Sequence, residues 1–276
     1  MSKKILFPTD FSKAAKNAFI YALKLADSIH AEIVTVHFYQ MPQANYINVS
    51  EYLGEIYDVN ELSNFENYKQ EVPTLRRIAE GNNLGHIKIS HALILGDVVH
   101  EIKILAENKN FDFIVMGTKG ATGLKDVLFG TIATKVMNEV SILTLLIPED
   151  CEYKLIDRIL FLTQYDLIEI EPFNTVLSFA QLFQSHVDCL RIVPNQDRIK
   201  NKCLEEWKAL SVQKSVSFST KVGNDIEGII LDSIKSIEAN MLAMHVHHKN
   251  FVANLIDSSL SKKLALHINI PILAIH

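Results

Sequence analysis

The sequence predicts an α/β protein made of two copies of one doubly wound unit, each with a mostly parallel sheet and helices on both faces. Short β-branched runs alternate with amphipathic helical stretches along the chain, and connection rules convert such an alternation into a parallel sheet. The order of elements in the first half returns in the second half, which indicates a duplicated domain. A chain of 276 residues with 48% hydrophobic residues is long and apolar enough for two cores.

The first strand and helix show these signals clearly. Lys3–Phe7 is a strand, and Ser12 is a natural N-cap for a helix over about Ser12–Ile29, where apolar residues recur at helical spacing. The other strands of this half are predicted at Glu32–Phe38, Ile87–Leu95, Asp112–Met116 and Leu143–Ile147. The other helices are predicted over about Glu61–Gly81, Gly96–Asn108 and Val127–Asn138.

The second half repeats this order. Its strands are predicted at Asp157–Thr163, Val187–Val193, Ser215–Lys221, Asn240–His245 and Pro271–Ile275. Its helices are predicted over about Glu171–Ser185, Asp197–Ser211, Asp225–Glu238 and Ile256–His267. The segments ILFPTDFS (Ile5–Ser12) and ILFLTQYD (Ile159–Asp166) align directly. The polar connector Pro148–Lys154 separates the copies, so we expect domains at residues 1–148 and 154–276.

Composition excludes several classes of function. The net charge is −5 and no dense Lys/Arg block is present, whereas nucleic-acid binders need a basic surface. No apolar run approaches the roughly 18 residues of a membrane helix, and the apolar run Ile5–Phe7 is too short for a signal-peptide core. The odd number of cysteines at unrelated spacings (Cys151, Cys189, Cys203) predicts reduced thiols in a cytoplasmic protein.

Polar and glycine residues follow the strands of the first half where a ligand site is expected. In open parallel sheets, ligands bind beyond the carboxyl ends of the strands. Strand 1 runs into Pro8-Thr9-Asp10, strand 2 ends at Phe38, and strand 4 runs into Met116-Gly117. Asp10 could accept hydrogen bonds from ribose hydroxyls or bind a divalent cation. Phe38 and Met116 offer apolar surface to a base.

The loop after strand 4 has the spacing G-x2-G-x9-G-T, formed by Gly117, Gly120, Gly130 and Thr131. Glycines allow main-chain amides to approach phosphate oxygens. Gly130 and Thr131 are predicted within a helix, near its start, where unsatisfied amides and the dipole favour an anion. The sequence has no G-x-x-x-x-G-K-[ST] motif and no G-x-G-x-x-G after strand 1, which disfavours a P-loop NTPase and an ordinary dinucleotide dehydrogenase.

The segments ILFPTDFS and MGTKGATGLKDVLFGT (Met116–Thr131) resemble the universal stress protein family, in element order over nearly all of Lys3–Pro148. The resemblance implies a Rossmann-like, adenine nucleotide alpha hydrolase-like fold with five parallel strands in the order 3-2-1-4-5. It also implies that the two sheets form an intramolecular pseudo-dimer paired through their last strands. ATP, alone or with Mg²⁺, is expected between strands 1 and 4.

Carried over position by position, the resemblance implies two groups of contacts. The adenosine would be lined by Pro8, Thr9, Asp10 and Phe38. The ribose and phosphates would be lined by Met116, Gly117, Gly120, Gly130 and Thr131.

The second half departs from this pattern. Pro8 and Asp10 correspond to Leu162 and Gln164. The three glycines Gly117, Gly120 and Gly130 correspond to His245, His248 and Ser258. Because side chains stand where main chain must approach phosphate, we expect no nucleotide site in this half.

Some residues allow two interpretations. Asp10 is either a ligand contact or a cap for the first helix. Lys119 either meets a phosphate or is a solvated loop lysine, and the second is favoured. The cluster His245, His247 and His248 is either a zinc site or a degenerate loop, and the lack of a neighbouring carboxylate or Cys favours the loop.

The sequence therefore predicts an ATP-binding, nucleotide-dependent stress-response module, with slow or no ATP hydrolysis and an unidentified protein partner. No nucleic-acid or membrane partner is expected, and a homodimer is left open. The alternatives are an enzyme that transfers adenylyl or phosphoryl groups, and an interaction module that binds no nucleotide.

Overall fold

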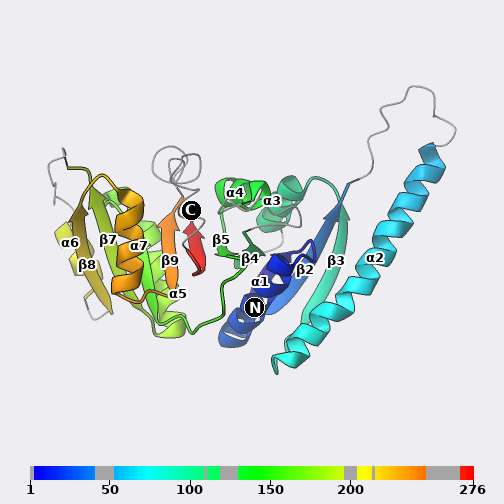
Figure 1. The fold of residues 1–276 in the computed structure, drawn as a ribbon, viewed down its shortest axis with the longest axis horizontal. Coiled ribbons are helices and arrows are strands. Elements are labelled where there is room, and N and C mark those ends of the chain that lie inside the picture. The colour runs from blue at the N-terminus through cyan, green and yellow to red at the C-terminus, as the bar shows by residue number, and fades with distance from the viewer. Residues whose placement is uncertain are drawn as a thin grey trace.

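The computed structural model describes residues 3–40, 53–108, 111–118, 130–195, 204–212, 215–246 and 268–276, with the side chains of residues 53–60 outside the description. The described strands form one ten-stranded sheet with helices on both faces (Figure 1). Two clusters of buried apolar side chains, one on each face, form the core. Each face of the sheet therefore has its own core.

The first half has the element order that the sequence predicts. Its elements are β1 Lys4–Pro8, α1 Lys13–Ile29, β2 Glu32–Tyr39, α2 Leu53–Gly81, β3 Ile89–Leu95, α3 Val98–Asn108, β4 Phe113–Gly117, α4 Thr131–Glu139 and β5 Leu143–Ile147. Ser12 caps α1 as predicted, since its hydroxyl accepts from the Ala15 amide at 3.2 Å.

Two predicted helix boundaries of this half are wrong. Helix α2 begins at Leu53 rather than near Glu61, because Gly54 falls in the first turn, where a glycine interrupts little. Helix α4 begins at Thr131 rather than near Val127, because Gly130 is its N-cap with φ −61° and ψ 160°. Gly130 and Thr131 therefore lie at the very start of the helix and not inside it.

The second half repeats the order of strands. Its elements are β6 Arg158–Leu162, the 3₁₀ turn η1 Leu167–Glu169, α5 Ile170–Phe183, β7 His186–Val193, α6 Leu204–Leu210, β8 Val216–Val222, α7 Ile226–Ser236, β9 Met241–His245 and β10 Ile272–Ile275. The helix predicted over Ile256–His267 lies outside the described residues. None of the described helices is long and apolar enough to cross a membrane.

The strand order confirms the predicted fold class. The sheet runs β3-β2-β1-β4-β5-β10-β9-β6-β7-β8, which is the order 3-2-1-4-5 followed by its reverse. Strands within each half pair in parallel, whereas β5 and β10 pair antiparallel with Leu145 opposite Leu273. The two five-stranded sheets therefore join edge to edge through their last strands.

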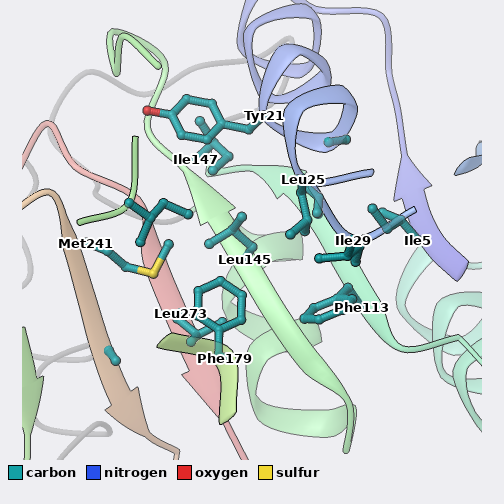
Figure 2. Close-up of a cluster of buried hydrophobic side chains, with 14 of the residues drawn as sticks. Ile5, Tyr21, Leu25, Ile29, Phe113, Leu145, Ile147, Phe179, Met241 and Leu273 are labelled. Atoms are coloured by element: carbon teal, nitrogen blue, oxygen red, sulfur yellow. The ribbon is translucent and has the colours of Figure 1, made fainter. Parts of the chain in front are cut away.

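Apolar side chains from both halves share one core at this seam (Figure 2). Leu145 of β5 and Phe113 of β4 lie with Leu273 of β10 and Phe179 of α5 in one buried cluster. The rings of Phe113 and Phe179 meet edge to face with centroids 6.1 Å apart. The halves therefore bury apolar surface against each other as well as sharing a sheet.

The connector between the halves is held on α1. The side-chain amide of Asn17 donates to the carbonyls of Pro148 and Cys151 at 3.2 and 2.9 Å. The Tyr21 hydroxyl donates to the Glu152 carbonyl at 2.7 Å, and burial raises the pKa of Tyr21 above its ordinary value. The described cysteines, Cys151 and Cys189, are buried and form no disulfide, and Cys203 lies outside the described residues.

Because the core is shared, we expect a destabilising substitution in the first half to lower the stability of the second half as well. Leu145→Ala removes a side chain that is 1% exposed and should cost about 2–5 kcal/mol of unfolding free energy. Trp207 of α6, the sole tryptophan, reports on the second half in urea unfolding followed by fluorescence. Its transition should move to lower urea in Leu145→Ala, and an unchanged Trp207 transition would show that the halves unfold independently.

Candidate functional site

A cleft of about 220 Å³ opens where β1, β2 and β4 end and α4 begins. It is lined by Pro8, Thr9, Asp10, Ala15, His37, Phe38, Val98, Met116, Gly117, Thr118, Gly130, Thr131, Ile132 and Ala133. Every predicted site residue within the described part of the chain is in this set. Gly120 and Lys119 lie outside the described residues, so the structure does not place them.

The chain makes a sharp turn at the end of β1. The Thr9 amide donates to the Val36 carbonyl at 2.9 Å, which holds the end of β1 against β2. Thr9 Oγ1 then accepts from the Phe11 amide and Asp10 Oδ1 accepts from the Ser12 amide, both at 3.0 Å. Asp10 lines the cleft and its carboxylate fixes the turn before α1, but the N-cap of α1 is Ser12, so the alternative role of Asp10 as the cap is wrong.

The ends of β4 and α4 are brought together by main-chain hydrogen bonds. The Thr118 amide donates to the Ile147 carbonyl at 3.0 Å, and the Gly130 amide donates to the Thr118 carbonyl at 2.5 Å. The first residues of α4 line the cleft, and the N-cap residue Gly130 has no side chain with which to cap the helix. The positive end of the α4 dipole and its first-turn amides therefore lie at the cleft wall.

Packing favours a glycine at position 117, in addition to its place in the cleft. A Cβ at this position would lie 3.1 Å from the Ala14 carbonyl carbon and 3.2 Å from its oxygen, in the first turn of α1. A side chain there would push against helix backbone, which cannot yield as a side chain can. Sequence reasoning gave only the approach of a ligand as the reason for this glycine.

His37 lines the cleft; the sequence places it at the end of strand 2 but assigns it no role. Its Nδ1 lies 2.7 Å from the Thr9 carbonyl oxygen, and since a carbonyl only accepts, Nδ1 carries the proton and Nε2 of the neutral ring is an acceptor. The centroid of the His37 ring lies 5.1 Å from that of Phe11. It lies 6.2 Å from that of Tyr68 of α2, on which the ring is stacked. Burial raises the pKa of Tyr68 to about 12, so its hydroxyl stays neutral.

The remaining cleft residues that sequence reasoning missed are Ala15, Val98, Thr118, Ile132 and Ala133. Thr118 and Ile132 adjoin predicted residues and could have been included by proximity. Ala15 and Val98 carry no polar group, so only the approach of α1 and α3 to the strand ends identifies them.

The same edge of the second half has a different lining. His245 ends β9 at the position of Gly117, while His247, His248 and Ser258 lie outside the described residues. At the end of β6, the Thr163 hydroxyl and the Gln164 amide donate to Glu169 Oε2 at 2.7 and 2.8 Å. Among the described residues, no three His, Cys, Asp or Glu side chains are grouped as a metal ion would require.

Known proteins give a consistent comparison. The family model described as Universal stress protein family matches residues 1–148. Two curated relatives from Methanocaldococcus jannaschii are universal stress protein MJ0531, 30% identical over 49% of this chain and 75% of its own length, and MJ0577, 25% identical over 50% and 90%. The fold is similar to a universal stress protein crystal structure from Archaeoglobus fulgidus, with a TM-score of 0.72, 19% identity and coverage of 100% of this chain and 96% of that one.

The packing of Gly117 predicts a loss of stability on a small substitution. Gly117→Ala places a methyl group against the Ala14 backbone and should lower the unfolding free energy by about 1–3 kcal/mol, measured by urea denaturation. Gly81→Ala is the matched control, because a Cβ at Gly81 meets nothing within 4 Å, and it should be neutral or slightly stabilising. Equal stability of the two variants would contradict the packing assigned to Gly117.

Proposed function

Since this chain belongs to the universal stress protein family, we propose that its first half binds an adenine nucleotide, ATP alone or with Mg²⁺, in the cleft at the ends of β1, β2 and β4. Bound nucleotide would then control the contacts of the molecule with a protein partner in a stress response. The observation that carries this proposal is the convergence of distant segments on one cleft, which is lined both by a helix start whose N-cap residue is a glycine and by apolar side chains.

Each wall of the cleft suits one part of the nucleotide. The first-turn amides of α4 and the Thr131 hydroxyl favour phosphate oxygens. Phe38 and Met116, which are 9% and 6% exposed, offer apolar surface to the base. Asp10 supplies carboxylate oxygens for ribose hydroxyls or for Mg²⁺, a cation that prefers such ligands.

Helix α2 is the element through which occupancy would act. His37 lines the cleft and its ring stacks on Tyr68 of α2, so a ligand that moves the imidazole also moves this contact. The N-terminal part of α2 extends beyond the sheet (Figure 1) and exposes Leu62 and Phe65. Nucleotide would shift the population of α2 positions only if it binds them with different affinities.

Binding rather than turnover is the activity that the cleft supports. Among the described residues that line it, Asp10 and His37 are the titratable ones. The Nδ1 proton of His37 is held by the Thr9 carbonyl, and no lysine or arginine lines the described cleft to stabilise a transferring phosphoryl group. We therefore expect slow ATP hydrolysis at most. The free thiols of Cys151 and Cys189 support a place in the reducing cytoplasm.

A charge at the start of α4 tests the site without damaging the helix. Gly130→Asp and Gly130→Asn both place a good cap at an extended N-cap, so both variants should keep the thermal stability of the parent. The carboxylate should weaken Mg-ATP binding more than tenfold (about 1.4 kcal/mol) relative to the isosteric amide, because it repels phosphate. Calorimetric titration measures both affinities.

Binding experiments on the unmodified protein test the proposal directly. Native mass spectrometry of gently purified protein should show one adenine nucleotide per chain, and calorimetry should give one Mg-ATP site. A protein that neither retains nor binds nucleotide would instead be an interaction module without a nucleotide. Rapid turnover to a product other than ADP would favour a group-transfer enzyme.

A further inference from the structure

The turn that borders the cleft is the same in both halves. Phe11 and Tyr165 both have positive φ, 58° and 57°. The helix after each turn ends on a residue with left-handed conformation, φ 54° in the first half and 57° in the second. The two segments therefore align without a gap from the first strand to the end of the helix. In this alignment Ala15 and Glu169 occupy the same position.

In the first half this position is small and apolar. Ala15 lines the cleft and is 5% exposed. Its amide donates to the hydroxyl of the N-cap Ser12 at 3.2 Å, which makes it the third residue after the cap. This side chain contributes only a methyl group to the cleft.

In the second half the same position holds a carboxylate that turns back to the strand end. Glu169 Oε2 accepts from the Thr163 hydroxyl at 2.7 Å, from the Gln164 amide at 2.8 Å and from the Asp166 amide at 3.4 Å. Asp166 and Glu169 form a reciprocal capping box. The donors at the end of β6 are therefore already used by an anion that belongs to the chain.

We propose that the residue at this position decides which half accepts an anionic ligand: Ala15 leaves the first cleft open, and Glu169 acts as a built-in anion that closes the second. The role of Ala15 rests on the nucleotide site proposed for the first half. The second half is closed by electrostatic repulsion and by the loss of free donors.

Transfer of the glutamate to the first half tests the role of Ala15. Because the Ser12 amide already donates to Asp10 Oδ1 at 3.0 Å and Ala15 is buried, the longer side chain of Ala15→Glu is directed into the cleft, and its melting temperature is compared with that of a variant of equal length. The affinity for Mg-ATP should fall about a hundredfold or more, because a carboxylate enters the cleft. Ala15→Gln is the matched control with the same length and no charge; it should match Ala15→Glu in melting temperature and lose about tenfold in affinity from size alone. Equal losses in the two variants, or no loss in Ala15→Glu, would overturn the assignment.

The reciprocal change tests the second half independently of ATP. Glu169→Ala leaves the Gln164 amide and the Thr163 hydroxyl without their acceptor, so the melting temperature should fall and added inorganic phosphate should restore part of it. Glu169→Gln keeps an acceptor oxygen and should show no such rescue. A phosphate effect equal in wild type and Glu169→Ala would refute the built-in anion, since phosphate bound in the first half affects both proteins equally.

The two experiments separate this inference from the proposed function. If wild type binds no Mg-ATP, the proposed function fails, while the phosphate rescue of Glu169→Ala still decides the role of Glu169. If wild type binds Mg-ATP and Ala15→Glu binds it equally well, the nucleotide site stands and the role of Ala15 is wrong.

Discussion

The antiparallel pairing of β5 with β10 is the constraint on which the rest of the structure depends. An open parallel sheet presents an unpaired edge strand, and such an edge attracts other chains. Here each half covers the last strand of the other, with Leu145 opposite Leu273. The same pairing places apolar side chains of both halves in one core, so stability gained in either half also supports the seam.

Helix α1 connects this seam to the cleft. One part of the helix holds the connector through Asn17 and Tyr21. Its first turn carries Ala15 on the cleft wall and packs its Ala14 backbone against the position of Gly117. The shape of the cleft therefore depends on how α1 lies across the sheet, and not only on the glycine-containing loop.

The two halves share one architecture and differ in side chains at the strand ends. Both halves retain the turn after the first strand, the strand order, and the left-handed residue that ends the following helix. Among the described residues, one difference beside the strand ends is that Ala15 of the first half is replaced by Glu169 in the second. Chemistry depends on the residues placed on a fold and not on the fold alone.

Much of the fold and the polar part of the candidate site could be predicted from the sequence. The alternation of elements and the repeat are local patterns, and they predicted the correct order of the described strands and α-helices, although not the short turn η1. The ends of parallel strands share one edge, so the grouping of Pro8, Thr9 and Asp10 with Gly117 and Gly130 in one cleft was also predictable. The start of α4 was not, because Gly130 adopts an extended N-cap conformation that composition does not reveal.

Tertiary structure alone decided the contacts between segments far apart in the chain. Ala15 and Glu169 are unremarkable in a sequence, since an alanine or a glutamate near a helix start is common. Their significance depends on which way the first turn of a helix faces relative to a strand end. The stacking of His37 on Tyr68 and the packing of Gly117 on Ala14 are of the same kind. A linear pattern records periodicity and residue type, whereas such contacts follow from the direction in which packed elements cross.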